Sequence, residues 1–311
     1  MSQPEVETSW TDEASGLRLA RSAAYPRVPG AVGLEGVPLT GKLRRSWALG
    51  VLGMRAWTWE PADRRDRQWW PQGITSAGEG DAGLLVSWYS KQGLSRLSVV
   101  DTRTGWYAHV ALAVPALADD GSVALGPLKV HAGGLARTGR WLHGAATAKG
   151  FWTAHLDDVV EVDGELVLPV RHAHRASAPD GVEPLRYSFM SAGSSGLVVG
   201  EYARGKRTRR LARIPVDPAT GLPCGAPVVA GDGPAGMQGA VERDGRWSVT
   251  TSHGPWTPGS LWTGSPDALV RRRWATPMGP EDLYADAGGD LWTVTEHPRR
   301  RWIVRLSPSR R

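Results

Sequence analysis

The sequence predicts an all-β chain folded as a β-propeller of five or six blades, each with three to four antiparallel strands. Two observations predict this fold: five segments share one internal plan, and each contains short apolar runs separated by glycine turns. The length of 311 residues fits one large all-β domain. We expect residues 1–40 to form an N-terminal extension, a cap or part of a sixth blade, and residues 41–311 to form the propeller.

Each repeat opens with a short motif of small or polar residues. The motifs are centred on Gly73, Gly134, Phe189, Gly239 and Asp282. In every repeat an apolar run follows the motif after a glycine turn, and a third run follows after a variable gap. Two third runs end in Asp-x-x-Thr-Gly, at 101–105 and 217–221, where the Asp side chain can accept backbone N–H bonds and Gly can adopt positive φ. These turns predict hairpins between the outer strands of a blade.

The last repeat supplies only three strands before Arg311, so a fourth strand must come from elsewhere if the ring is to have no open edge. The stretch from Trp47 to Trp59 precedes the first complete repeat and is the predicted closing strand. Large rings at strand positions are expected to fill the space between neighbouring blades. These rings are Trp141, Trp152, Trp247, Trp262, Trp292 and Trp302.

Composition argues against several classes of protein. No apolar run approaches the roughly 18 residues that a membrane helix needs, and the N-terminal residues lack the pattern of a secretory signal, so we expect a cytoplasmic protein. The single cysteine, Cys224, excludes an internal disulfide and a cysteine metal cluster. No nucleophile elbow, phosphate loop or His-Glu-x-x-His motif is present, which argues against ordinary hydrolase and nucleotide-binding classes.

The net charge of +6 comes almost wholly from arginine. Clusters at 204–210, 271–273 and 299–301 lie between apolar runs, where hairpin tips are expected. We expect solvated loop charges there rather than nucleic-acid binding.

Several segments resemble a family of actinobacterial β-propeller proteins, often labelled as secreted. They include WPQGI at 70–74, SWYS at 87–90, HAGGL at 131–135, MQGA at 237–240 and GPEDL at 279–283. The resemblance covers roughly residues 68–308 and implies a propeller fold without implying a reaction.

The innermost strands of a propeller run along its central channel and all start at the same end of it, here called the axial mouth. The opening motifs of the repeats therefore define the candidate site. They contribute Gln72, His131, Ser188, Gln238, Glu281 and Asp282. We expect Glu281 and His131 to form a catalytic acid/base pair if apolar neighbours raise the carboxyl pKa, with Gln72 and Gln238 as orienting amides. The alternative is that these polar groups only tie the blades together by binding backbone groups.

The ends of the second strands supply a second ring that could line the same mouth. Its members are Ser87, Trp88, Tyr89, His143, Glu201, Ser252, His253, Glu296 and His297. The expected ligand-binding residues from both rings are Gln72, Ser188, Gln238, Asp282, Trp88, Tyr89 and His253. His172 and His174 resemble a metal pair, but Arg171 and Arg175 flank them, so an exposed loop or strand end is favoured.

The first functional hypothesis is a propeller that binds a small organic ligand in a polar axial pocket, as a cofactor-independent isomerase, cyclase or lyase. The alternative is a non-catalytic module in which Trp88, Tyr89 and Trp256 bind a carbohydrate or a protein partner. Whether the protein is an enzyme is left open. No cofactor is expected; the alternative is a divalent cation such as calcium, held by Glu281, Asp282 and His131.

Overall fold

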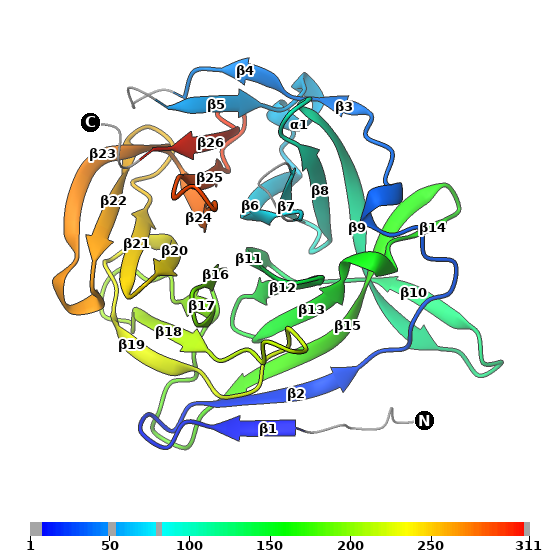
Figure 1. Ribbon diagram of the computed structural model, residues 1–311, viewed down its shortest axis with the longest axis horizontal. Helices are drawn as coiled ribbons and strands as arrows, with labels where there is room; N and C mark the ends of the chain where they lie inside the picture. The colour runs from blue at the N-terminus through cyan, green and yellow to red at the C-terminus, as the bar shows by residue number, and fades with distance from the viewer. Residues whose placement is uncertain (1–7, 49–53, 79–82, 308–311) are drawn as a thin grey trace.

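The computed structural model describes residues 8–48, 54–78 and 83–307. Their strands form sheets of 13, four, four and five strands around one axis (Figure 1). In the 13-stranded sheet, β15 (Glu165–Ser177) pairs in parallel with β9 (Trp106–Leu117) and joins two antiparallel units, so five four-stranded units follow one another along the chain. The innermost strands pack on one another in a closed ring, in the order β6, β11, β16, β20, β24 and back to β6. The predicted all-β propeller is confirmed.

The units follow one another along the chain. The first contains β6 (Trp69–Ser76), β7 (Gly83–Ser90), β8 (Ser95–Asp101) and β9 (Trp106–Leu117). The second contains β11 (Ala132–Thr138), β12 (Trp141–Ala146), β13 (Phe151–His155) and β15 (Glu165–Ser177). The third contains β16 (Phe189–Gly193), β17 (Gly196–Gly200), β18 (Arg210–Ile214) and β19 (Val228–Asp232). The fourth contains β20 (Met237–Arg243), β21 (Arg246–Thr251), β22 (Pro258–Gly264) and β23 (Val270–Met278).

The fifth unit is completed by a strand from the N-terminal part of the chain, as predicted. Its strands are β24 (Pro280–Ala285), β25 (Leu291–Thr295), β26 (Trp302–Leu306) and β5 (Arg55–Thr58). β5 pairs antiparallel with β26, with Ile303 opposite Trp57. Residues 49–53 of the predicted closing stretch lie outside the described residues. Because the closing strand precedes the first unit, both ends of the ring are joined by hydrogen bonds.

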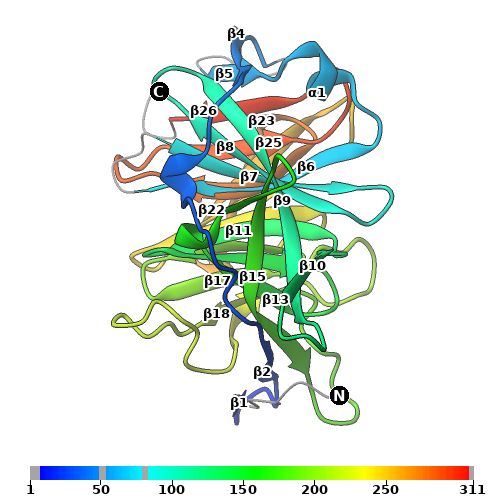
Figure 2. The same ribbon diagram turned by 90° about the vertical axis from the view of Figure 1, so that its right-hand side faces the viewer.

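The described residues before β5 lie along the outer edges of the units (Figures 1 and 2). β1 (Thr8–Thr11) pairs with β2 (Arg18–Ala24), and β2 pairs with β15. β3 (Gly41–Lys42) pairs with β9, and β4 (Arg44–Ser46) pairs with β5. Two short strands, β10 (Val123–Pro127) and β14 (Val160–Val162), form hairpins with β9 and β15. The N-terminal segment therefore covers outer edges of the sheets.

Apolar side chains fill the space between neighbouring units, because successive residues of a strand face opposite sides of the sheet. Each of five clusters joins two units, represented by the pairs Leu97 with Trp152, Ala145 with Leu197, Val198 with Val249, Val241 with Leu283, and Val86 with Val294. Trp152, Trp247, Trp292 and Trp302 are buried, as predicted for wedge-filling rings. Within the described ranges, no helix is long and apolar enough to cross a membrane.

The Asp-x-x-Thr-Gly turns join outer strands, as predicted. Asp101 Oδ1 accepts a 2.8 Å hydrogen bond from Arg103 N, and Asp217 Oδ1 accepts a 2.9 Å bond from Ala219 N. The closing glycines, Gly105 and Gly221, have φ of 76° and 72°. The conformation that only glycine adopts readily is therefore used at both turns.

A polar cluster fixes the short helix α1 (Pro61–Arg65), which follows the closing strand, to the first unit. Asp63 Oδ1 accepts hydrogen bonds from Arg96 and His109 at 2.9 and 3.0 Å, and Asp63 Oδ2 accepts one from the Tyr107 hydroxyl at 2.5 Å. The buried Arg301 guanidinium donates to the main-chain oxygens of Asp63 and Trp69. The ring closure therefore rests on polar ties as well as on strand pairing.

Candidate functional site

The innermost strands approach so closely that their motif glycines leave no room for a side chain. A Cβ on Gly134 would lie 2.1 Å from Met190 N, and a Cβ on Gly239 would lie 2.6 Å from Leu283 N. Both distances are far below ordinary van der Waals contact. The repeated glycines of the opening motifs are thus explained by packing around the axis.

The Asp282 side chain ties innermost strands together at the propeller axis. Its Oδ2 atom accepts backbone hydrogen bonds from Ile74 N at 3.1 Å and Leu135 N at 2.9 Å, so one carboxyl group ties β24 to β6 and β11. The residue is 1% exposed, and burial raises its pKa well above the ordinary value although the backbone N–H groups oppose that shift. Asp282 was expected to bind ligand, but its contacts are those of a structural tie.

Glu281 and Gln238 lie one step nearer the surface, at the mouth. Gln238 Nε2 donates a 2.9 Å hydrogen bond to Glu281 Oε1. Gln72 Nε2 donates to Glu296 Oε2 at 3.4 Å and to Pro71 O at 2.9 Å. Four polar side chains from three units therefore meet at the axial mouth.

The carboxyl groups of Glu281 and Glu296 interact, and each affects the pKa of the other. Burial raises the pKa of Glu281 well above its ordinary value, and the charges of Glu296 and Asp282 raise it further. Burial also raises the pKa of Glu296. Two adjacent carboxyl groups, one buried and one half-buried, cannot both ionise at low cost, so a proton on one of them is favoured.

His131 and Tyr89 form one rim of the mouth. His131 Nε2 lies 3.1 Å from Gln72 Oε1, which can only accept, so this nitrogen carries the proton. The His131 ring lies 4.0 Å from the Tyr89 ring, and burial lowers the pKa of His131. Burial, followed by the charges of Glu296 and Glu281, raises the pKa of Tyr89, which places its hydroxyl in the field of the carboxyl pair.

The predicted acid/base partners, Glu281 and His131, are connected indirectly. His131 contacts Gln72, Gln72 contacts Glu296, and Glu296 contacts Glu281. Glu296 is therefore the immediate partner of Glu281. The second-ring pattern had placed it near the mouth, but sequence spacing could not show that the two carboxyl groups meet.

His297 and Trp70 form another part of the mouth. His297 Nε2 lies 3.5 Å from Glu296 Oε1, and the Trp70 ring meets the His297 ring edge-on at 6.2 Å. Burial lowers the pKa of His297, and the charges of Arg300 and Arg301 lower it further. A neutral imidazole beside Glu296 can exchange protons with it.

Trp88 lies in the core, not in an exposed loop as the alternative hypothesis required. It is 0% exposed, its Nε1 donates a 2.7 Å hydrogen bond to Ser98 Oγ, and its ring packs 4.9 Å from that of Trp59. The described contacts of Trp88 are therefore those of a core residue. Tyr89, the next residue, faces the opposite side of the strand and reaches the mouth.

Ser188 and His253 are held by other contacts. Ser188 is half-buried, and its backbone N–H donates to Gly200 O at 2.8 Å. His253 is exposed, and its Nε2 lies 3.0 Å from both Ser260 Oγ and Arg271 Nη2 within the fourth unit. Neither contact extends to the mouth cluster.

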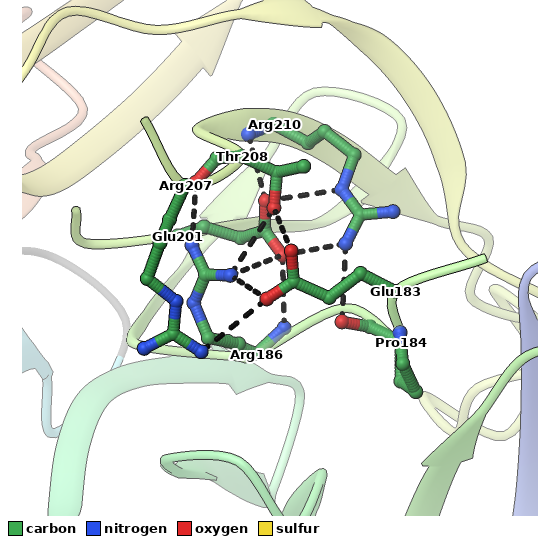
Figure 3. Close-up of polar contacts among 7 residues, drawn as sticks. All are labelled: Glu183, Pro184, Arg186, Glu201, Arg207, Thr208 and Arg210. Atoms are coloured by element: carbon green, nitrogen blue, oxygen red, sulfur yellow. Dashed lines mark hydrogen bonds and ion pairs between the residues drawn. The ribbon is translucent and has the colours of Figure 1, made fainter. Parts of the chain in front are cut away.

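Glu201 is enclosed by arginines (Figure 3). Its Oε2 accepts from Arg210 N and Nε at 2.9 and 3.0 Å, and its Oε1 accepts from Arg210 Nη2 at 2.7 Å and from Arg186 N at 3.2 Å. Although burial opposes it, these hydrogen bonds lower the pKa of Glu201. This second-ring residue therefore orders the loop between β17 and β18.

The remaining histidines are structural. His143 is 0% exposed between Thr138 and Thr153, and burial lowers its pKa to about 3. His174 is 2% exposed and stacks on Phe151 at 4.2 Å. The prediction of an exposed loop or strand end at 172–174 was wrong, because these residues lie within β15, which pairs with β13 on one side and with β2 on the other, and neither histidine is exposed.

A metal was considered at the mouth because carboxylate and amide oxygens can bind calcium. In the part of the chain that the structure describes, no group of three or more His, Cys, Asp or Glu side chains is placed to hold a metal ion. Asp282, one of the three proposed ligands, binds backbone N–H groups in the closed axis. The described donor set therefore does not fit the proposed cation.

No protein-family model and no curated protein matches the chain. It is similar to the PQQ-bound aldose sugar dehydrogenase of Streptomyces coelicolor, with 16% identity over 88% of this chain and 83% of that chain, and a TM-score of 0.42. It is also similar to the exo-beta-1,3-galactanase of Phanerochaete chrysosporium with galactose, with 13% identity over 76% of this chain and 60% of that chain, and a TM-score of 0.46. With similarity this low, function must be argued from the residues of this chain.

Proposed function

We propose that the protein binds a small, neutral, hydroxyl-bearing molecule at the axial mouth through Glu281, Glu296, Gln72 and Gln238. The supporting observation is the pairing of two carboxyl groups, that of the buried Glu281 and that of the half-buried Glu296. In the described part of the chain neither carboxyl forms an ion pair with Lys or Arg. Burial without such a partner costs folding free energy, and strongly perturbed carboxyls in this arrangement are concentrated at functional sites.

The hydrogen-bond donors and acceptors at the axial mouth favour one class of ligand. A carboxyl and a carboxylate side by side offer a donor and an acceptor, and the two amides, Tyr89 and His131 add more of both. An anionic ligand would be repelled by the ionised member of the pair. A cationic ligand would have to displace the shared proton. A neutral polyol or sugar can exchange hydrogen bonds with every one of these groups.

The finer proposal is a cofactor-independent acid/base reaction of the isomerase, cyclase or lyase type. Glu281, whose pKa is raised by burial, would donate a proton to the bound molecule, and Glu296 would accept one. A carboxyl whose pKa is raised toward neutrality is suited to this role. The apolar faces of Trp70 and Tyr89 would keep bulk water from the reacting groups.

A second proposal, a non-catalytic binding module for a carbohydrate or a protein, is supported by Trp256. This side chain is 74% exposed, and the Arg300 guanidinium lies 3.8 Å from its ring. An exposed flat ring next to the fifth unit could contact a ligand that extends beyond the mouth.

The test is a thermal-shift screen of neutral monosaccharides and polyols with the wild type, Glu296→Gln and Glu161→Gln. Glu161 is exposed on β14, so its variant is a matched control. Ligands are expected to raise the Tm of the wild type and the control but not that of Glu296→Gln. Failure of every neutral ligand, or equal shifts in all three proteins, would contradict the proposal. NMR of a bound ligand then separates the two classes: conversion by the wild type but not by Glu281→Gln indicates acid/base catalysis, and binding without conversion indicates a module.

A further inference from the structure

A cavity of about 580 Å³ lies at the second unit, and none of the residues of the axial mouth is among its lining residues. Its walls come from β2 and Tyr25, from β13 and β15, from the turn at 147–150 and from the link at 128–130. Cavities of this size accommodate small organic molecules. The N-terminal segment supplies one wall through Ser22, Ala23 and Tyr25. In Figure 1, β2 runs along the outer edge of β15, with which it pairs.

The shape of the cavity follows from one row of side chains across three paired strands. Trp152 lies opposite Ala173, and Ala173 lies opposite Ala23. One large ring is therefore followed by two small side chains on the same face, and the alanines leave space beside the indole. The indole is fixed against Gly144, where a Cβ would lie 2.1 Å from Trp152 Cζ2.

Tyr25 lies just past the end of β2, two residues along the chain from Ala23. It is half-buried, burial raises its pKa, and its backbone N–H donates to Arg171 O at 2.9 Å. Tyr25 and the buried Trp152 are both among the lining residues, so the space over Ala23 and Ala173 is a slot bordered by two aromatic side chains. Such a slot favours a flat aromatic ring.

The charge at the edge of the slot is positive. Lys149 and Arg175 both line the cavity and are exposed, and the lining contains no Asp or Glu. In the described residues neither of these cations forms an ion pair. The turn that carries Lys149 is fixed by Ala148, whose φ is 65° and whose N–H donates to Arg186 O at 2.7 Å.

We infer that this cavity is a second small-molecule site, specific for a planar aromatic anion. The ring lies over Ala23 and Ala173 between Trp152 and Tyr25, and the anionic group meets Lys149 and Arg175. Apolar area and ring contacts supply affinity, and the two cations select the charge of the ligand.

The experiment uses 1-anilinonaphthalene-8-sulfonate as a fluorescent probe and naphthalene-2-sulfonate as its competitor. Naphthalene-2-sulfonate is expected to displace the probe, whereas neutral naphthalene-2-methanol displaces it only at higher concentration. The double variant Lys149→Ala/Arg175→Ala is expected to bind naphthalene-2-sulfonate about ten-fold more weakly, since two exposed ion pairs contribute roughly 1 kcal/mol or less each. The matched control, Lys206→Ala/Arg272→Ala, removes two exposed cations elsewhere and is expected to match the wild type.

Two further variants locate the site. Ala23→Phe fills the slot and is expected to abolish displaceable binding, with a thermal melt as the check that it is folded. Glu281→Gln, at the axial mouth, is expected to leave binding unchanged. The inference is overturned if the charge variant binds as the wild type does, if Ala23→Phe is folded and still binds, or if Glu281→Gln weakens binding as much as the charge variant does.

Discussion

Gln238 and Glu281, from the innermost strands of adjacent units, are joined by a 2.9 Å hydrogen bond at the axial mouth. Because the amide donates, Glu281 Oε1 serves as an acceptor, and the neighbouring Glu296 carboxyl favours the protonated form of Glu281. Glu281→Gln imitates the protonated state of this carboxyl without adding charge. This substitution therefore removes the titratable carboxyl group, so its effect on stability and its effect on acid/base chemistry can be measured separately.

Glu281→Gln is expected to stabilise the protein, increasingly so as pH rises. Burial raises the pKa of Glu281 in the folded chain, so between the ordinary and the raised pKa the unfolded chain loses a proton that the folded chain keeps. The free energy of unfolding therefore falls with rising pH over that window, by about 1.4 kcal/mol per unit of pKa elevation. Urea denaturation at pH 4 and pH 8 should show a larger gain at pH 8. An equal gain at both pH values would contradict the raised pKa.

Gly239→Ala is expected to destabilise the protein by about 1–3 kcal/mol, because the new Cβ would overlap the backbone of Asp282 and Leu283. Gly78 is the matched control, since a Cβ there meets nothing within 4 Å. Gly78→Ala should be neutral or stabilising by up to about 1 kcal/mol. Chemical denaturation compares the two variants, and equal stabilities would show that the inner strands do not need close contact.

Asp63→Asn is expected to lower the free energy of unfolding by about 2–3 kcal/mol at pH 7. Although burial opposes the shift, hydrogen bonds from His109 and Tyr107 and the charge of Arg96 hold the pKa of Asp63 well below its ordinary value. The stabilisation is therefore present above the unfolded pKa and is lost as pH falls through the folded pKa. Denaturation at pH 7 and pH 3 should show a smaller deficit at pH 3. Asp180→Asn, an exposed control, should show no deficit at either pH.

Trp88→Phe is expected to cost about 2–4 kcal/mol of stability, because it leaves a gap in the core and removes the hydrogen bond to Ser98. Trp256→Ala is expected to cost about 1 kcal/mol or less, since this ring is exposed and contacts Arg300. Thermal melts compare the two. A greater loss for Trp256→Ala would mean that the exposed ring has a structural role.

The repeat and the ring closure could be predicted because they depend on local patterns. Gly134 and Gly239 recur at equivalent positions because each inner strand touches its neighbours, and the missing fourth strand of the last repeat required a donor. The sequence did not show which of Trp88 and Tyr89 faces the core. Adjacent strand residues face opposite sides, and two neighbouring aromatic residues do not reveal which side is the core.

The sequence also could not predict contacts between segments that are far apart in the chain. His174 is buried because β2, from the N-terminal segment, pairs with β15, and nothing near His174 in the sequence indicates that partner. The contact of Glu281 with Glu296 depends on how the end of β25 meets the start of β24 at the axis. Sequence placed both near one mouth but could not give their separation.

A carbon-13 titration of the glutamate side-chain carboxyl groups, assigned with Glu281→Gln, tests the shared proton at the mouth most directly. One carboxyl signal is expected to remain protonated at pH 7 and to disappear in the variant. If every glutamate in the wild type titrates near its ordinary pKa, Glu281 and Glu296 do not share a proton, and the axial mouth is not an acid/base site.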